Sequence, residues 1–314
     1  IAMEASSHGL DQRRLDGVEI KTAAFTNFSR DHLDYHTSYE DYFNAKKGLF
    51  ERLCPKEKNG VFNIDNKEIK KLAHWYGLKN HIATIGYDKT ADLIILSQKF
   101  YPKSQDIRFS FRNKIYQKSI NLIGAFQAEN LLMAALLVIS SGQQETNVFE
   151  VLEYIKPVRG RMELAATRQN GATVYVDYAH TPDALKNVLE TINNFRTGNE
   201  QLITVVGCGG NRDKTKRPKM AHIASQLSTQ SIFTSDNPRT ENPETILEEM
   251  EVGVSEENLI KVITISDRRQ AIKTACKFSE TGDILLIAGK GHENYQEIRG
   301  ERFHFDDLVE VKKY

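Results

Sequence analysis

Lys46 occupies a position where an apolar side chain would be expected. Residues 38–53 predict one amphipathic helix that begins with a Ser-x-x-Asp capping signal. Its expected apolar stripe comprises Tyr39, Tyr42, Phe43, Leu49, Phe50 and Leu53. Lys46 falls on this stripe, so it must extend its amine to water, pair with a carboxylate or lose its proton. A neutral amine is a nucleophile that can take up carbon dioxide as a carbamate.

Two further polar residues in the same half of the chain could act with Lys46. Glu4 ends a strand-like run at 1–5, and His32 lies in a polar segment after a second run at 20–27. A carboxylate, an imidazole and a carbamate on Lys46 would together suit Mg²⁺ beside phosphate oxygens. Glu4 and His32 could equally form a hydrogen-bonded pair near a turn, and the residue types leave both interpretations open.

In the second half, three polar loops each follow an apolar strand-like run. The loops comprise residues 207–218, 236–243 and 289–293. Because helical patterns separate the runs, the strands should be parallel, and their carboxyl ends should meet at one edge of the sheet. There, Arg212 and Arg239 offer guanidinium groups, Asn237 an amide and Glu293 a carboxylate. Guanidinium groups suit carboxylates and a carboxylate suits an ammonium, so the loops predict a pocket for a zwitterion such as an amino acid.

Simpler interpretations of these loops exist. Gly207-Cys-Gly-Gly could be a dinucleotide-binding turn, although it lacks the third glycine of G-x-G-x-x-G. The run from Asp236 to Arg239 could be only a turn with a helix cap.

Composition bounds the class of protein. The chain has 314 residues, of which 40% are hydrophobic and 27% charged, and 42 basic residues balance 42 acidic ones. This balance gives no electrostatic case for nucleic acid or an anionic membrane, and no apolar run approaches a membrane span. Three distant cysteines indicate a reducing compartment rather than a disulfide framework. The sequence shows no signal peptide, and because it starts at Ile1 on a strand-like run we expect that a natural N-terminal part is missing.

The elements that must position these residues predict an α/β protein of two domains. In the first half we expect strands at 1–5, 20–27, 60–64 and 82–86, a hairpin at 106–119, and helices at 38–53, 67–76, 125–141 and 146–155. In the second half a hairpin around Asn170-Gly171 precedes strands at 201–206, 231–235, 260–265 and 283–288, which alternate with helices at 183–196, 215–228, 243–252 and 267–279. The candidate boundary at 157–160 separates a domain at 1–156 from a doubly wound, Rossmann-like domain at 157–314.

The chain resembles the Mur ligases of bacterial cell-wall synthesis from Met3 to its C-terminal helix. The matching motifs are Glu4–Gly9, Thr26–His36, Gly124–Asn130, Gly160–Glu163, Val176–Pro182, Gly207–Lys214, Asp236–Arg239 and Gly289–Glu293. The resemblance implies a central ATPase-type, mostly parallel sheet domain, truncated here, followed by the Rossmann-like domain. It also places the family's carbamylated lysine at Lys46.

The resemblance further implies an ATP-dependent amide ligase that adds meso-diaminopimelate to UDP-N-acetylmuramoyl-L-alanyl-D-glutamate through an acyl phosphate. Such an enzyme uses Mg²⁺ and would be a monomer in the bacterial cytoplasm.

By motif position, Glu4, His32 and Lys46 are the metal and catalytic residues. The expected ATP-binding residues are Asn130, Arg161, Asp177, Tyr178 and His180. Ser6 and Arg14 match positions that hold the muramoyl dipeptide. The diaminopimelate residues would be Arg212, Asp236, Asn237, Arg239, Gly289 and Glu293. Arg239 would hold the second carboxylate, which lysine lacks.

The sequence departs from the family in two ways. The family's glycine-rich phosphate loop and N-terminal uridine-nucleotide domain are absent from these residues, so we expect the chain to be inactive alone. Gln127 stands where the family often has Asn, which weakens the adenine assignment. Two alternatives therefore remain: a non-catalytic amino-acid- or peptide-binding protein that has lost the nucleotide loop, and a related ligase with another amino acid or a folate substrate.

Overall fold

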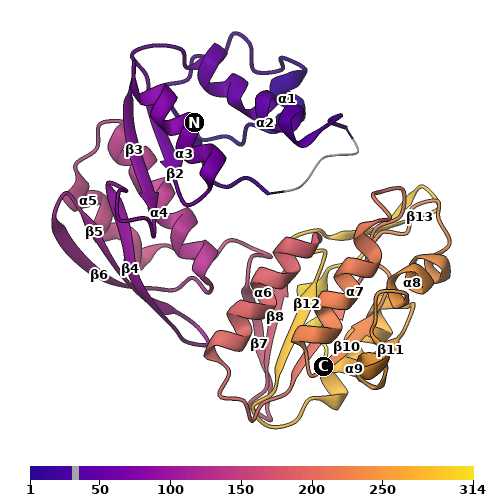
Figure 1. Ribbon diagram of the computed structural model, residues 1–314. Coiled ribbons are helices and arrows are strands. Elements are labelled where there is room, and N and C mark those ends of the chain that lie inside the picture. The colour runs from indigo at the N-terminus through magenta and orange to yellow at the C-terminus, as the bar shows by residue number, and fades with distance from the viewer. Residues whose placement is uncertain (30–34) are drawn as a thin grey trace. The chain divides into compact units, whose positions relative to one another are not determined.

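The computed structural model describes residues 1–29 and 35–314 and divides into two compact units (Figure 1). The first unit comprises residues 1–100 and 104–155, and the second comprises 101–103 and 156–314. His32 lies outside the described residues.

The first unit is a mixed sheet with helices on both faces. Its strands are β1 (Thr22–Phe25), β2 (Asn59–Asn63), β3 (His81–Gly86), β4 (Leu93–Phe100), β5 (Gln105–Phe111) and β6 (Lys114–Ile120). Its helices are α1 (Ser7–Asp11), α2 (Tyr39–Gly48) with a π-helical turn at Leu49–Leu53, α3 (Lys67–Gly77), α4 (Ala125–Ser140) and α5 (Glu145–Glu150) with a 3₁₀ turn at Val151–Tyr154. The strands follow the order β1-β2-β3-β4-β5-β6, parallel from β1 to β4 and antiparallel from β4 to β6.

The period-two alternation of β2 explains the two faces of this sheet. Val61 packs into the apolar cluster that contains Leu132 and Phe149 of α4 and α5. The next residue, Phe62, points to the opposite cluster, which contains Phe50 of the π-helical turn after α2 and Ile69 of α3. Each face therefore has its own apolar core.

The second unit is a doubly wound sheet. Its strands are β7 (Glu163–Thr167), β8 (Thr173–Asp177), β9 (Leu202–Val206), β10 (Gln230–Phe233), β11 (Val262–Thr264) and β12 (Ile284–Ala288), with a separate hairpin of β13 (Tyr295–Ile298) and β14 (Glu301–His304). Its helices are α6 (Pro182–Phe195), α7 (Lys216–Leu227), α8 (Pro243–Glu251), α9 (Arg268–Phe278) and α10 (Asp307–Val311), and a 3₁₀ turn spans Glu256–Lys261. The order β11-β10-β9-β12-β8-β7 is parallel except for β7, so the predicted fold class is confirmed.

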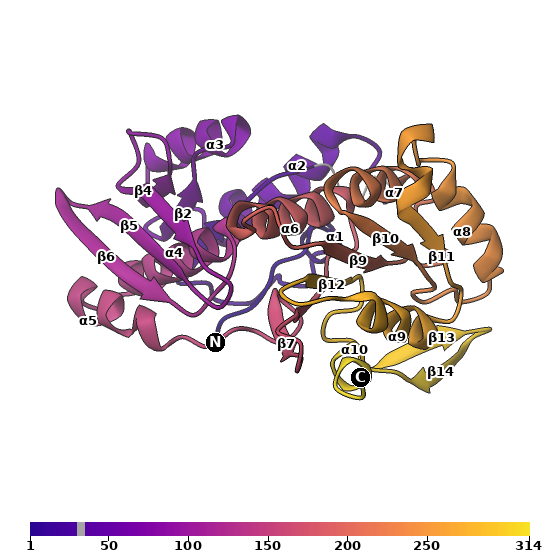
Figure 2. The same ribbon diagram turned by 90° about the horizontal axis from the view of Figure 1, so that it is seen from below.

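Helices cover both faces of this second sheet. Figure 2 shows α6 and α7 on one face, and α9 and α10 on the other. The strands β9 and β12 are buried along their whole lengths, as expected of central parallel strands. Their carboxyl ends lead into the polar loops at 207–218 and 289–293.

Several sequence predictions differ from the structure. Residues 1–5 form no strand; they join no sheet, and Ile1 and Met3 are exposed. The strand β4, the helix α1 and the β13–β14 hairpin were not predicted. Tyr39, the first residue of the expected stripe on α2, is 41% exposed, whereas Tyr42 is buried.

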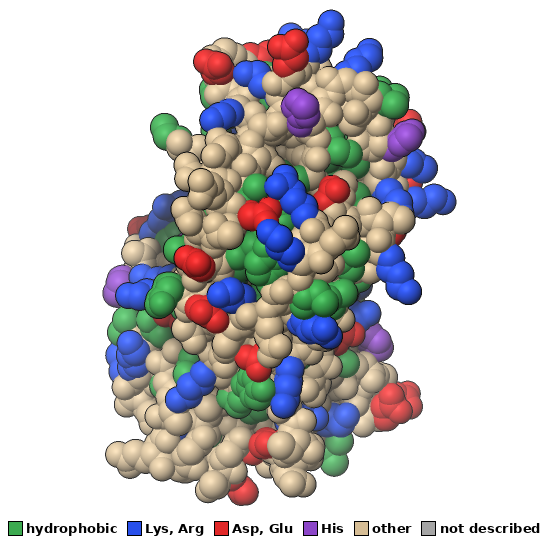
Figure 3. Space-filling model, turned by 90° about the vertical axis from the view of Figure 1, so that its left-hand side faces the viewer, with side chains coloured by type: hydrophobic (Ala, Val, Ile, Leu, Met, Phe, Trp, Pro, Cys, Tyr) green, Lys and Arg blue, Asp and Glu red, His purple; other side chains and the backbone are tan. Residues whose placement is uncertain are grey.

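Surface charge is mixed where it can be seen. On the face drawn in Figure 3, Lys and Arg side chains are interspersed with Asp and Glu. The part of the chain described here contains no helix that combines the length and the apolar character needed to cross a bilayer. All three cysteines are buried and unpaired.

Candidate functional site

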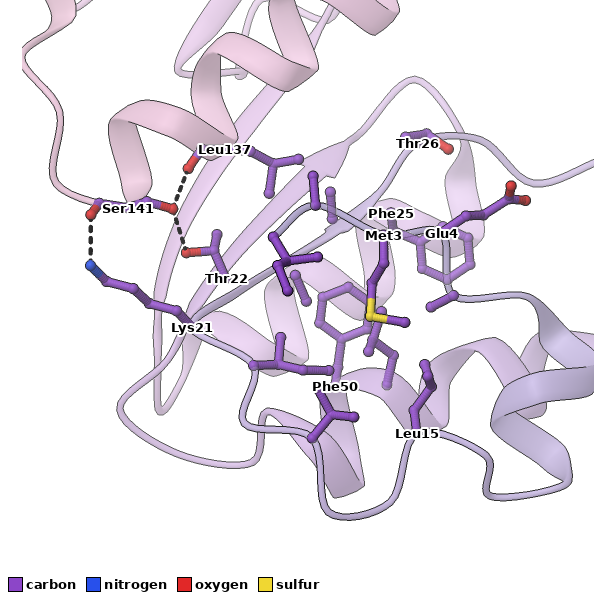
Figure 4. Close-up of a pocket in the computed structure, with 18 of the residues that line it drawn as sticks. Met3, Glu4, Leu15, Lys21, Thr22, Phe25, Thr26, Phe50, Leu137 and Ser141 are labelled. Carbon is purple, nitrogen blue, oxygen red and sulfur yellow. Dashed lines mark hydrogen bonds between the residues drawn. The ribbon is translucent and has the colours of Figure 1, made fainter.

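The first unit contains a cavity of about 980 Å³ beside β1. Met3, Phe25 and Phe50 gather in its middle, and Glu4 lies on the same side as Thr26 (Figure 4). Most of the wall is apolar. Glu4 and Thr26 are polar residues on one side, and Lys21, Thr22 and Ser141, which are joined by hydrogen bonds, lie on the other (Figure 4).

Lys46 lines the same cavity as Glu4. The helix α2, which carries Lys46, begins as predicted. The Ser38 hydroxyl accepts a hydrogen bond from the Asp41 amide at 3.0 Å. The Lys46 amine lies 5.3 Å from the centroid of the Tyr42 ring, and the residue is half-buried. Two of the three predicted metal ligands therefore share one cavity, while His32 lies outside the described residues.

The predicted dipeptide-binding residues lie near the start of the chain. Ser6 caps α1, since its hydroxyl accepts a hydrogen bond from the Gly9 amide at 3.1 Å. Arg14 is exposed and contacts Gln12 through its guanidinium group. Neither arrangement tests a role in substrate binding.

The predicted ATP-binding residues fall in both units. Asn130 is an exposed residue of α4 in the first unit. The other four, Arg161, Asp177, Tyr178 and His180, lie around the carboxyl end of β8 in the second unit.

Asp177 is a buried carboxylate that ties two turns together. Its Oδ2 accepts a hydrogen bond from the Met162 amide at 2.6 Å, and its Oδ1 accepts one from the Ala179 amide at 2.8 Å. Burial raises the pKa of Asp177 to about 6, although the two amides and Arg161 counteract this shift. The carboxylate therefore fixes the backbone that carries Arg161 and Tyr178.

Tyr178 is the centre of an aromatic and cationic cluster. The Arg161 guanidinium lies 5.0 Å from its ring centroid, and the rings of His180 and His292 lie at 4.5 and 4.9 Å. Burial raises the pKa of the Tyr178 phenol, and the nearby charges of Glu293 and Asp236 raise it further. Tyr178, which is expected to contact ATP, thus lies near Asp236 and Glu293, which are expected to contact the amino acid.

The three polar loops of the second unit converge at the carboxyl ends of their strands. The Gly210 amide donates to the carbonyl of Asn237 at 2.9 Å, and the Asn237 side-chain amide donates to Glu293 Oε2 at 2.9 Å. An added Cβ at Gly210 would lie 2.0 Å from the Pro238 carbonyl oxygen, so only glycine permits this approach. The predicted meeting of residues from separate loops is therefore observed.

The two arginines lie on the same side of this cluster. A Cβ placed on Gly209 would lie 3.0 Å from Arg239 Nη1 and 3.8 Å from Arg212 Cγ. Arg239 Nη1 donates to the Gly210 carbonyl at 2.8 Å, and its Nε lies 3.5 Å from Glu297 Oε2. Arg212 is exposed. The converging loops thus carry guanidinium groups, a carboxylate and an amide, which is chemistry suited to a zwitterion.

Two buried cations in these loops were missed from the sequence. Arg217 is fully buried and donates to Glu241, Glu249 and the Gly209 carbonyl, so it ties two of the loops together. The pattern that singled out Lys46 would have found it, because Arg217 shares a helix face with Met220, Ala221 and Ala224. Lys290 is also fully buried, between two glycines that follow the all-apolar β12.

Among residues 1–29 and 35–314, no group of three or more His, Cys, Asp or Glu side chains is placed to hold a metal ion. This result does not test the predicted metal site. Of its three ligands, His32 lies outside the described residues, and Lys46 is not one of the residue types considered.

The fold and these loops define a class: a sheet domain followed by a doubly wound domain with a polar cluster at its strand ends. Comparison with known families matches residues 1–138 to the Mur ligase middle domain and residues 160–291 to the Mur ligase, glutamate ligase domain. The chain therefore belongs to the Mur ligase family.

Similar proteins point to one branch of that family. The chain is 41% identical over 315 residues to the UDP-N-acetylmuramoyl-L-alanyl-D-glutamate--2,6-diaminopimelate ligase of Bacteroides thetaiotaomicron, covering 100% of this chain and 63% of that protein. It is 43% identical to the ligase of the same name from Cytophaga hutchinsonii, covering 99% of this chain and 62% of the relative. The chain spans less than two thirds of the length of these curated relatives.

One solved structure agrees with this placement, and another shares the fold. A structure of a UDP-N-acetylmuramoyl-L-alanyl-D-glutamate--2,6-diaminopimelate ligase matches with a TM-score of 0.65 at 38% identity, over 99% of this chain and 63% of that chain. The MurF ligase of Thermotoga maritima in complex with ADP matches with a TM-score of 0.70 at 16% identity, over 98% of this chain and 64% of that chain. This second likeness shows the shared fold alone.

Proposed function

We propose that these residues form the larger part of an ATP-dependent ligase that adds meso-diaminopimelate to UDP-N-acetylmuramoyl-L-alanyl-D-glutamate in peptidoglycan synthesis. The observation that carries the proposal is the convergence of three loops of the second unit: Asn237 of the second loop contacts Glu293 of the third, and Arg239 of the second loop contacts Gly210 of the first. The printed names of the relatives supply the substrates.

In the proposed reaction, the γ-phosphoryl group of ATP is transferred to the D-glutamate side-chain carboxylate, which gives an acyl phosphate and ADP. The neutral amine of diaminopimelate then attacks the acyl carbon, and a tetrahedral intermediate forms. The intermediate loses a proton from nitrogen and expels inorganic phosphate to leave the amide. The part of this chain is positioning, which removes much of the entropic cost of bringing the amine to the acyl group. We assign Arg239 and Arg212 to the distal carboxylate, and Asp236, Asn237, Gly289 and Glu293 to the ammonium end.

The residues of the first unit fit a divalent cation in part. Glu4 and Lys46 line one cavity, and a carbamate on Lys46 would supply a second anionic ligand group. We propose His32 as the third ligand. When bound, Mg²⁺ would neutralise charge on the transferred phosphoryl group. We further propose that Asn130, Arg161, Asp177, Tyr178 and His180 hold ATP, and that Ser6 and Arg14 hold the muramoyl dipeptide.

These 314 residues contain no Gly-x-x-x-x-Gly-Lys-Ser/Thr sequence. We therefore propose that the chain alone binds the amino acid but does not turn over. Phosphate release should stay at the level of a protein-free control when ATP, Mg²⁺, the UDP-muramoyl dipeptide and meso-diaminopimelate are all present. Sustained release would refute this part of the proposal.

Calorimetric titration of the chain tests the amino-acid site directly. We expect meso-diaminopimelate to bind more tightly than L-lysine, and Arg239→Ala to reduce that preference at least about tenfold, the cost of a lost charged hydrogen bond. Arg196→Ala is the matched control, because Arg196 donates to Thr229 at the amino end of β9. Equal affinity for the two amino acids in the native chain would contradict the proposal.

A further inference from the structure

Lys290 is a fully buried ammonium group in the second unit. It lies in a turn held by Gly289 and Gly291, both with positive φ. Its Nζ lies 3.1 Å from Glu293 Oε2, 3.1 Å from Asn237 Oδ1 and 3.5 Å from Asp236 Oδ1. The ring centroid of Tyr295 is 5.5 Å away. Desolvating an ammonium is costly unless it is paired, so this position needs an explanation.

The contacts of Lys290 determine which way Asn237 points. Asn237 Oδ1 accepts from Lys290 and from the Glu297 backbone amide, the latter at 2.9 Å. A backbone N–H can only donate, so this side of the Asn237 amide must be the oxygen. The Asn237 nitrogen then faces Glu293 Oε2, to which it donates.

Glu293 is held in turn by one of its two oxygens. Oε2 accepts from both Lys290 and Asn237, whereas Oε1 receives no hydrogen bond from the residues that the structure describes. The Glu293 side chain is 18% exposed, compared with 0% for Lys290. One carboxylate oxygen is thus fixed by the protein, and the other is left for a ligand.

The charges of the cluster are also informative. One ammonium faces the two carboxylates of Asp236 and Glu293, which leaves one formal negative charge. A single substrate ammonium would balance it.

We propose that Lys290 is a positioning residue for the amine substrate: by fixing Asn237 and Oε2 of Glu293, it leaves Oε1 of Glu293 to accept a hydrogen bond from the substrate ammonium. This inference rests on the proposed function. Lys290 itself does not touch the substrate.

The direction in which one substitution changes the affinity for diaminopimelate distinguishes a positioning role of Lys290 from a purely electrostatic one. Lys290→Met keeps the unbranched shape and most of the length of the side chain but leaves both carboxylates uncompensated. If Lys290 acted only through its charge, its loss would strengthen the attraction between the cluster and the substrate ammonium group, and diaminopimelate would bind more tightly. If it positions Glu293, the loss weakens binding, because both hydrogen bonds that orient the acceptor are disturbed.

Calorimetry on the 314-residue chain should use meso-diaminopimelate and pimelate, the same dicarboxylate without ammonium groups. We expect Lys290→Met to weaken diaminopimelate binding at least about tenfold and pimelate binding less than about twofold. Lys277→Met, an exposed lysine of α9, is the control. Unchanged or tighter diaminopimelate binding, or an equal loss for both ligands, would overturn the inference.

A second variant covers the case in which Lys290→Met does not fold. Lys290→Met/Asp236→Asn restores the single negative charge of the native cluster and should be compared with Asp236→Asn alone. We expect the double variant to bind diaminopimelate at least about tenfold more weakly than Asp236→Asn. Equal affinity would overturn the inference. If the native chain binds no diaminopimelate, the proposed function fails with it.

Discussion

At the scale of single residues, the contribution of Asp177 to the stability of the fold should depend on pH. Its carboxylate is buried and accepts two backbone amides, and burial raises its pKa to about 6. The folded state therefore holds the Asp177 proton at pH values where the unfolded chain, with a usual pKa near 4, has lost it. The contribution of Asp177 to stability is greatest below about pH 4 and falls as the pH rises to about 6.

The expected size of this effect is about 3 kcal/mol, since two pKa units separate the folded and unfolded states. Urea unfolding between pH 4 and pH 7 should show the native chain losing about this much stability relative to Asp177→Asn, which cannot titrate there. The carboxyl carbon of Asp177, followed by NMR, should titrate near pH 6. Parallel stability profiles and a midpoint near 4 would contradict the assignment.

Lys46 offers a second prediction at this scale. If its amine carries a carbamate, ¹³C-labelled bicarbonate should give one carbamate resonance that is absent from Lys46→Arg, because a guanidinium does not form this adduct. Lys47→Arg is the matched control: Lys47 is the neighbouring lysine and pairs with Glu51 at 2.7 Å. A signal that persists in Lys46→Arg, or no signal in the native chain, would count against the modification.

The residues found from the sequence and those missed differ for a physical reason. Lys46 stood out because a cation on an apolar helix face is costly to bury, and Arg217 carries the same signal in the first turn of α7. Lys290 lies in a loop, where no periodicity marks which side chains turn inward. Its burial follows only from the convergence of chain segments more than 50 residues apart, as its contacts with Asp236 and Asn237 show.

At the scale of elements, the turn after β12 depends on a close approach that a side chain would block. Gly291 has φ +53°, and a Cβ there would lie 2.6 Å from the Tyr178 Cβ and 2.8 Å from the Gly160 carbonyl oxygen. Gly291→Ala should therefore cost about 2–4 kcal/mol, the sum of backbone strain and overpacking. Gly198→Ala, with φ +99° and no atom within 4 Å, should cost only about 1 kcal/mol.

Chemical denaturation of both glycine variants would measure this difference. We also expect Gly291→Ala to weaken diaminopimelate binding, because the turn carries Lys290 and Glu293. Equal stability of the two variants would show that the contact with Tyr178 can relax.

Most elements could be predicted where hydrophobic period and turn chemistry agree. The strands and helices from α6 to β12 match their predicted ranges within about three residues, since each apolar strand alternates with an amphipathic helix. The expected strand at 1–5 failed because a strand needs a hydrogen-bonded neighbour, and residues 1–5 line a cavity instead of joining β1. β4 was missed although Leu93 and Ile95 are buried, since a short apolar run fits several structures.

At the scale of the whole molecule, the two units have separate apolar cores. One set of clusters contains residues of the first unit only, and another contains residues of the second unit only. Units with their own cores can unfold in separate steps. A ligand that binds one unit then stabilises that unit alone.

This separation can be measured because Trp75, the single tryptophan, lies in α3 of the first unit. We expect calorimetry to show two unfolding transitions, of which tryptophan fluorescence reports only one. Diaminopimelate at 100 times its dissociation constant should add about 2.7 kcal/mol to the second unit, a rise of roughly 5–10 °C in its midpoint. The fluorescence transition should not move. An affinity about tenfold lower in Arg239→Ala should reduce the added stability to about 1.4 kcal/mol at the same ligand concentration, roughly half the native calorimetric shift. If diaminopimelate instead raised the fluorescence midpoint by the same amount, the units would unfold together, and the assignment of independent cores would be wrong.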